Sequence, residues 1–147
     1  MGGEPGCNMV GHVHGNQNYK AIISGRRVNV HVEADGDCDQ DKKGGPVFLH
    51  HAMVHVVVDG LPLINARHSD VKSVTLSPGP PPATGTPTAI VEGIYNTIPF
   101  KVTLTDGDKG DKDCRGDKDD TVVVMMPVLP VPITGSAPHN DVHIDFK

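Results

Sequence analysis

The sequence predicts a small all-β protein that forms a single domain over residues 1–147. No stretch keeps a 3.6-residue apolar period for three turns, so no helix is expected. Several segments instead alternate apolar and polar residues with a period of two, the pattern of a half-buried strand. The 17 glycines and 13 prolines supply many turns, and aromatic residues make up only 3% of the chain. The core must therefore be aliphatic.

The clearest strand pattern lies in residues 27–33, where Val28, Val30 and Val32 alternate with polar residues. Residues 100–105 and 141–146 alternate in the same way. Further strands are expected at residues 53–59, 73–77, 88–92 and 121–126.

Three regions are predicted to be loop insertions. Residues 35–46 are acidic and then basic, residues 78–87 are rich in Pro and Gly, and residues 106–120 are crowded with Asp, Lys and Gly. Residues 127–132 contain three prolines, which favours an extended connection or an edge strand.

Composition excludes several classes of partner. The net charge of −5 without a basic stripe argues against nucleic acid and against docking on anionic lipid. No apolar run reaches the roughly 20 residues of a membrane span, and the first ten residues lack the pattern of a signal peptide. The cysteines Cys7, Cys38 and Cys114 are odd in number and widely spaced, so they predict free thiols and no disulfide framework. Synthesis in the cytoplasm is expected.

The segment Gly11-His12-Val13-His14-Gly15 points to metal binding. Residues i and i+2 of a strand face the same side, so two imidazoles can reach one ion, and the glycines are expected to let the backbone bend. The alternative is a pair of ordinary surface histidines.

The remaining histidines allow more than one ligand set. His51 and His55 share a face if the alternation holds, and His50 falls on the other face; His68, His139 and His143 follow later in the chain. A tetrahedral site needs four nitrogen or sulfur ligands, and the residues alone do not fix which four. The chain contains no nucleophile elbow, no phosphate-binding loop and no HExxH motif, so no enzymatic activity is expected.

Several short motifs resemble PAAR-repeat proteins, the tips of the spikes of contractile injection systems, in type VI secretion or in phage-like tails. Three segments show a Gly-led turn followed by a short alternating strand, at residues 23–30, 84–93 and 134–144. The other matching motifs are His14-Gly15, Gly60-Leu61-Pro62 followed by Ala66-Arg67 and Asp70, Gly135-Ser136-Ala137-Pro138, and Cys114-Arg115-Gly116.

The resemblance implies a β-cone with pseudo-threefold symmetry and a zinc ion near its apex, held by three histidines and one cysteine. By position, His14 and Cys114 would be ligands, and His12 with His50 or His51 would complete the set. The implied partner is a trimeric β-helical spike protein, with effector cargo as a further partner. The implied function is a structural tip, assembled into a virion or injection apparatus, that pierces the target membrane.

Three alternatives remain open. In a homotrimeric spike, His12 and His14 of each subunit would surround iron, giving one metal per three chains in place of one per chain. An HxH strand in a Gly-rich β protein also resembles copper/zinc superoxide dismutase, a redox enzyme. The third alternative is a β-sandwich adhesion or decoration module that binds no metal.

Overall fold

The computed structural model describes residues 6–42, 44–79, 85–107, 120–127, 133–137 and 142–146. Within these residues, the strands form two antiparallel five-stranded sheets, which confirms the all-β prediction. The described helical structure is one short 3-10 turn, η1 (His68–Asp70), and the described chain has no helix with the length and hydropathy to cross a membrane.

The first sheet, here called the long sheet, has the strand order β10-β1-β2-β3-β4. Its strands are β1 (Gly11–Ile23), β2 (Arg26–Gln40), β3 (Val47–Val58), β4 (Leu61–Ala66) and β10 (Val142–Phe146). The chain runs through β1 to β4 as a meander, and β10 returns from the end of the chain to pair with the first five residues of β1.

The second sheet, here called the short sheet, is a meander in sequence order. Its strands are β5 (Val71–Ser77), β6 (Thr88–Tyr95), β7 (Ile98–Thr105), β8 (Asp120–Met125) and β9 (Ile133–Ala137). Turn η1 connects β4 to β5 and so carries the chain from one sheet to the other.

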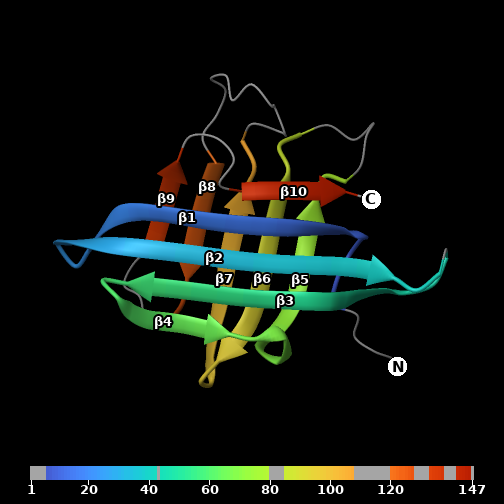
Figure 1. Ribbon diagram of the computed structural model, residues 1–147, viewed down its shortest axis with the longest axis horizontal. Coiled ribbons are helices and arrows are strands. Elements are labelled where there is room, and N and C mark those ends of the chain that lie inside the picture. Colours follow the sequence, from blue (N-terminus) through green and yellow to red (C-terminus); the bar gives the residue numbers. More distant parts are fainter. Residues whose placement is uncertain are drawn as a thin grey trace.

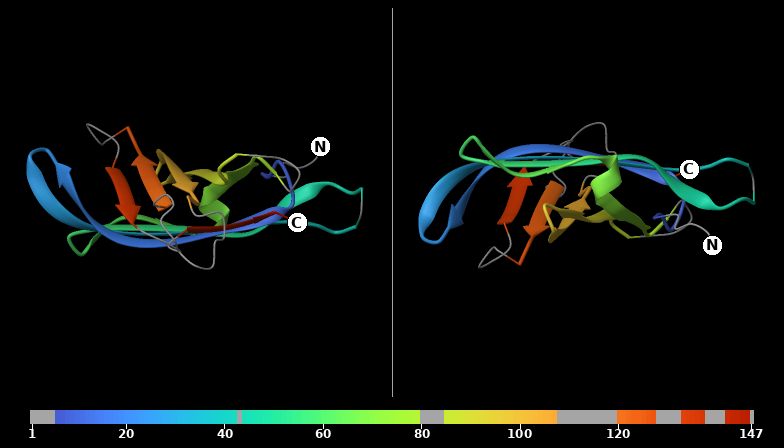
Figure 2. Two further views of the ribbon diagram at one scale, coloured as in Figure 1. Left: turned by 90° about the horizontal axis from the view of Figure 1, so that it is seen from above. Right: turned by 90° about the horizontal axis from the view of Figure 1, so that it is seen from below.

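The two sheets pack face to face as a sandwich. Figure 1 shows that the strands of the long sheet run across those of the short sheet, which lies behind it. Figure 2 shows the two layers from the side, with the β1–β2 hairpin (blue) extending past β9 and curving toward it. Such crosswise packing is one of the two common ways in which sheets stack.

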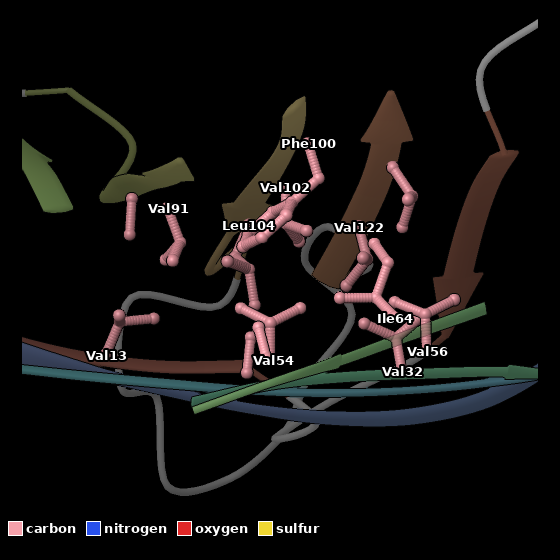
Figure 3. Packing of buried hydrophobic residues seen from close by; sticks show 14 of the residues in the cluster. Val13, Val32, Val54, Val56, Ile64, Val91, Phe100, Val102, Leu104 and Val122 are labelled. Atoms are coloured by element: carbon pink, nitrogen blue, oxygen red, sulfur yellow. The ribbon is translucent and has the colours of Figure 1, made fainter. Parts of the chain in front are cut away.

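One aliphatic core fills the space between the sheets. The alternation of each strand turns every second side chain inward, and Val32, Val54 and Ile64 of the long sheet are fully buried. They belong to the same cluster as Val102 and Leu104 of β7 and Val122 of β8 (Figure 3). Because β-branched residues dominate this cluster, it matches the strand propensity of the sequence.

All seven predicted strand segments fall on strands and overrun them by at most one residue, but β2 and β3 extend six or seven residues beyond the predicted segments. The prediction of a loop over residues 35–46 is wrong for its first half, because β2 continues to Gln40 with Gly36 and Cys38 turned inward. In the second predicted insertion, the described residues 78–79 and 85–87 are not in strands, and residues 80–84 lie outside the described residues. Residues 108–119 of the third insertion and residues 128–132 also lie outside them.

The three-sided cone is not the arrangement of the described strands. The three Gly-led segments would form its walls, but residues 26–30 lie in β2 of the long sheet and residues 88–93 in β6 of the short sheet. The described part of the third segment is split between β9 and β10, which belong to different sheets. Three equivalent walls therefore do not form.

Cys7 and Cys38 form a disulfide, which corrects the prediction that they are free thiols. They are 31 residues apart in sequence, and the fold brings their Cα atoms to 6.0 Å, within the usual range for a disulfide. Cys114 lies outside the described residues.

Candidate metal centre

His12 and His14 lie on β1 with their side chains on the outer face of the long sheet. Val13, between them, points into the core and is 1% exposed. The same-face arrangement expected from the i, i+2 spacing is present in β1.

The strand register brings further polar side chains beside these two histidines. His14 lies opposite His143 of β10 on one side and Asp35 of β2 on the other. His12 lies opposite Asp145 and Asp37 in the same way, and Asp37 lies opposite His51 of β3. Imidazoles and carboxylates thus share one outer surface, the histidine–aspartate patch, which consists of His12, His14, Asp35, Asp37, His51, His143 and Asp145.

Asp145 links two imidazoles within the patch. Its Oδ2 atom is 3.6 Å from Nε2 of His12 and 3.6 Å from Nε2 of His143. The centroids of these two imidazole rings are 6.3 Å apart. Two donors bound tetrahedrally to one zinc ion are about 3.4 Å apart, given bonds of about 2.1 Å. The carboxylate is therefore close to the separation from each imidazole that a shared ion requires.

Asp35 fixes the orientation of His14. Nδ1 of His14 contacts Oδ1 of Asp35 in a short hydrogen bond. An ionised carboxylate only accepts hydrogen bonds, so Nδ1 carries the proton and Nε2 keeps its lone pair. In many metal sites, a carboxylate that does not bind the metal itself accepts this N–H and so orients the metal-binding imidazole.

Two inward-facing glycines lie directly beneath the patch. A Cβ atom on Gly15 would come within 2.3 Å of Cδ2 of Leu104, and one on Gly36 within 2.8 Å of Cγ2 of Val74. These glycines allow side chains of the short sheet to pack against the backbone of the long sheet. Gly15, one of the two glycines that flank the histidine pair, allows this close packing.

A shallow depression of about 410 Å3 lies over the middle of the patch. His12, His14 and His51 line it together with Asp35 and Asp37. The surface is open: the side chains of His12, His14 and His143 are 33%, 50% and 54% exposed.

The predicted ligands do not all meet. His51 lines the same depression as His12 and His14, and its ring centroid is 6.5 Å from that of His68. His50 is displaced by an irregularity in the β2–β3 pairing and lies beside Phe48, outside the depression. The predicted ligand Cys114 falls outside the described residues.

Sequence reasoning did not identify Asp35, His143 and Asp145 as members of the site. The alternation of residues 141–146 places His143 and Asp145 on one face of a strand. It does not indicate that this strand pairs with β1, which requires the three-dimensional structure.

The donor types of the patch suit a first-row transition metal. Imidazole nitrogen with carboxylate oxygen is typical of zinc sites. Among the described residues, no three His, Cys, Asp or Glu side chains already stand as a group that could hold a metal ion. Occupation of the patch therefore requires these exposed side chains to rotate.

Neither the protein-family models nor the curated proteins nor the solved structures include a match to this chain.

Proposed function

We propose that this protein is a non-enzymatic β-sandwich binding module that holds a zinc ion on the outer face of its long sheet. The observation that carries the proposal is the placement of His12, His14 and His143 on two paired strands around Asp145. His12 and His143 already direct Nε2 toward the same carboxylate oxygen.

Asp35 supports the assignment because it leaves His14 with a free Nε2 on the outer surface. The proposal requires the exposed side chains of His12, His14 and His143 to rotate until their donors meet at one ion. His12, His14, His143 and Asp145 together supply the four ligands of a closed tetrahedral zinc site, the kind that is typical of structural zinc.

A sandwich module agrees better with this fold than a spike tip does. The resemblance to PAAR-repeat proteins implies a cone, whereas the described strands form two stacked sheets. The zinc proposal uses His143 and Asp145 in place of Cys114 and His50.

The test is zinc titration of the purified chain by calorimetry, with the metal content measured after dialysis. We expect about one zinc per chain. Replacement of His14 or His143 by Ala should weaken zinc binding by more than about 100-fold, and Asp35→Ala, which removes only the orienting carboxylate, by about 10–100-fold. Affinity should also fall on acidification, because protons compete for the imidazole nitrogens.

His31→Ala is the matched control, since His31 lies on the same outer face but is hydrogen-bonded to Asn18, away from the patch. It should bind zinc as the unaltered chain does. Absence of stoichiometric zinc, or equal loss of affinity in His31→Ala and His14→Ala, would refute the proposal. Stoichiometric iron or copper in place of zinc would also contradict it.

A further inference from the structure

The segment Gly6–Asn8, here called the N-terminal strap, lies along the outer edge of β5. Strand β5 is the first strand of the short sheet and pairs with β6 on its other side. Cys7 forms a parallel bridge with Val74, and the amide of Val74 donates a 2.7 Å hydrogen bond to the carbonyl oxygen of Gly6. The strap therefore occupies an edge that would otherwise offer free backbone groups.

Asn8 extends this pairing with its side chain. Its Nδ2 atom donates to the carbonyl oxygen of Leu76 at 2.7 Å, and its Oδ1 atom accepts from the amide of Leu76 at 2.8 Å. The carboxamide thus satisfies both backbone groups of one β5 residue, as a neighbouring strand would.

The disulfide fastens the strap to the opposite sheet. Cys7 belongs to the strap, and Cys38 lies in β2 of the long sheet. Cys38 is fully buried, whereas Cys7 remains partly accessible. The fit on the β5 side is also close, since a Cβ on Gly6 would lie 3.0 Å from the carbonyl oxygen of Lys72 at a φ of +76°.

We propose that the Cys7–Cys38 disulfide is a redox-controlled clasp that keeps the edge of β5 covered. A dithiol reductant opens it in two exchange steps. One reductant thiolate attacks the more accessible Sγ of Cys7, and Cys38 leaves as a thiolate. The second thiol of the reductant then attacks the reductant sulfur that is bonded to Cys7, and Cys7 leaves as a thiolate. The reductant gains a disulfide, and the protein gains two electrons and two protons.

The open clasp leaves the strap held by its hydrogen bonds to Val74 and Leu76. Release of the strap bares the amides of Val74 and Leu76 and the carbonyl of Leu76. These groups can then accept an added strand, a common mode of peptide recognition. The clasp is independent of the zinc proposal, because none of its residues belongs to the histidine–aspartate patch.

The experiment compares amide hydrogen exchange by NMR for the whole chain before and after treatment with a dithiol. We expect exchange at Val74 and Leu76 to accelerate by at least about tenfold, while amides of the central strands β2 and β6 keep their protection. Cys7→Ser should show the same local exchange without reductant. Unchanged exchange at Val74 and Leu76 would overturn the proposal. Equal acceleration at every amide would also overturn it, because the disulfide would then stabilise the whole fold.

A second measurement follows the rate of reduction itself. Asn8→Ala removes both hydrogen bonds to Leu76, so the strap opens more often and Cys7 should be reduced several-fold faster. Asn18→Ala, which removes a contact to His31 on the long sheet, is the matched control and should leave the rate unchanged. Equal rates for the two variants would contradict the proposal, because the hydrogen bonds of Asn8 would then not hold the strap against the edge of β5.

Discussion

The two faces of the long sheet are built from alternate residues of the same strands, yet they have opposite chemistry. Along β2, the inward series includes Val30, Val32 and Ala34, whereas the outward series includes His31, Glu33 and Asp35. The inner face is fixed by packing against the short sheet. The outer face is free of that constraint, so its imidazoles and carboxylates are available for binding.

In this sheet, the inward-facing residues of each strand serve packing, and the outward-facing residues carry the polar groups that are available for binding. A substitution on the inner face should change stability, and a substitution on the outer face should change binding alone. Each prediction below tests that separation.

The largest expected effect is that of Ile64→Ala on the inner face. Ile64 of β4 is fully buried, and Figure 3 shows it beside Val32, Val56 and Val122. Its truncation leaves a cavity, and the free energy of unfolding should fall by about 2–5 kcal/mol. Denaturant titration measures the change.

Ile22→Ala makes the same chemical change on the outer face, where Ile22 is 67% exposed. Its effect should stay within about 0.5 kcal/mol. Equal destabilisation by the two variants would show that the faces are not energetically distinct.

Gly36→Ala tests the inner face directly beneath the histidine–aspartate patch. The added methyl group would lie 2.8 Å from a methyl group of Val74, which is itself fully buried. Overpacking should lower the free energy of unfolding by about 1–3 kcal/mol. Asn16→Ala, an exposed outward position on β1, should have little effect. An unchanged free energy of unfolding in Gly36→Ala would mean that the two sheets can move apart locally without loss of stability.

The clearest correct strand predictions have large apolar inward residues, such as Phe100, Val102 and Leu104 of β7. The sequence of β1 indicates a strand only at its HxH segment, because Gly15 and Gln17 are among its inward residues and weaken the alternation. The alternation is also weak at the end of β2, where Gly36 and Cys38 face the core. This part of β2 therefore reads as the first half of a loop at residues 35–46. No alternating pattern in the sequence predicts the short strands β4 and β9.

The candidate site could be predicted only in part. The spacing of His12 and His14 places both on one face of one strand. Their neighbours His143 and Asp145 come from the opposite end of the chain, and their position depends on which strand β10 pairs with. The Cys7–Cys38 disulfide depends in the same way on a contact between distant segments.

Among the substitutions on the inner face, the smallest effect at neutral pH is expected for Tyr19→Phe, which removes a polar group on the inner side of β1. The ring of Tyr19 packs on Gly135 of β9, where a Cβ would come within 2.3 Å of it. Its buried hydroxyl has no hydrogen-bond partner among the described residues. Removal of the hydroxyl should therefore change the free energy of unfolding by no more than about 1 kcal/mol near pH 7.

The same substitution should matter at alkaline pH. Burial raises the pKa of Tyr19 from 10.0 to about 12, so the folded protein retains the phenol proton at a pH where the unfolded chain has lost it. Below pH 10 both states are protonated and stability is complete; between pH 10 and about 12 ionisation of the unfolded chain reduces stability. Unfolding titrations across this window should show a smaller loss for Tyr19→Phe than for the unaltered chain or for Tyr95→Phe. Identical pH profiles for all three proteins would show that solvent reaches Tyr19 on the inner face of β1. The inner and outer faces of the β1–β2 hairpin would then not differ in burial at this position.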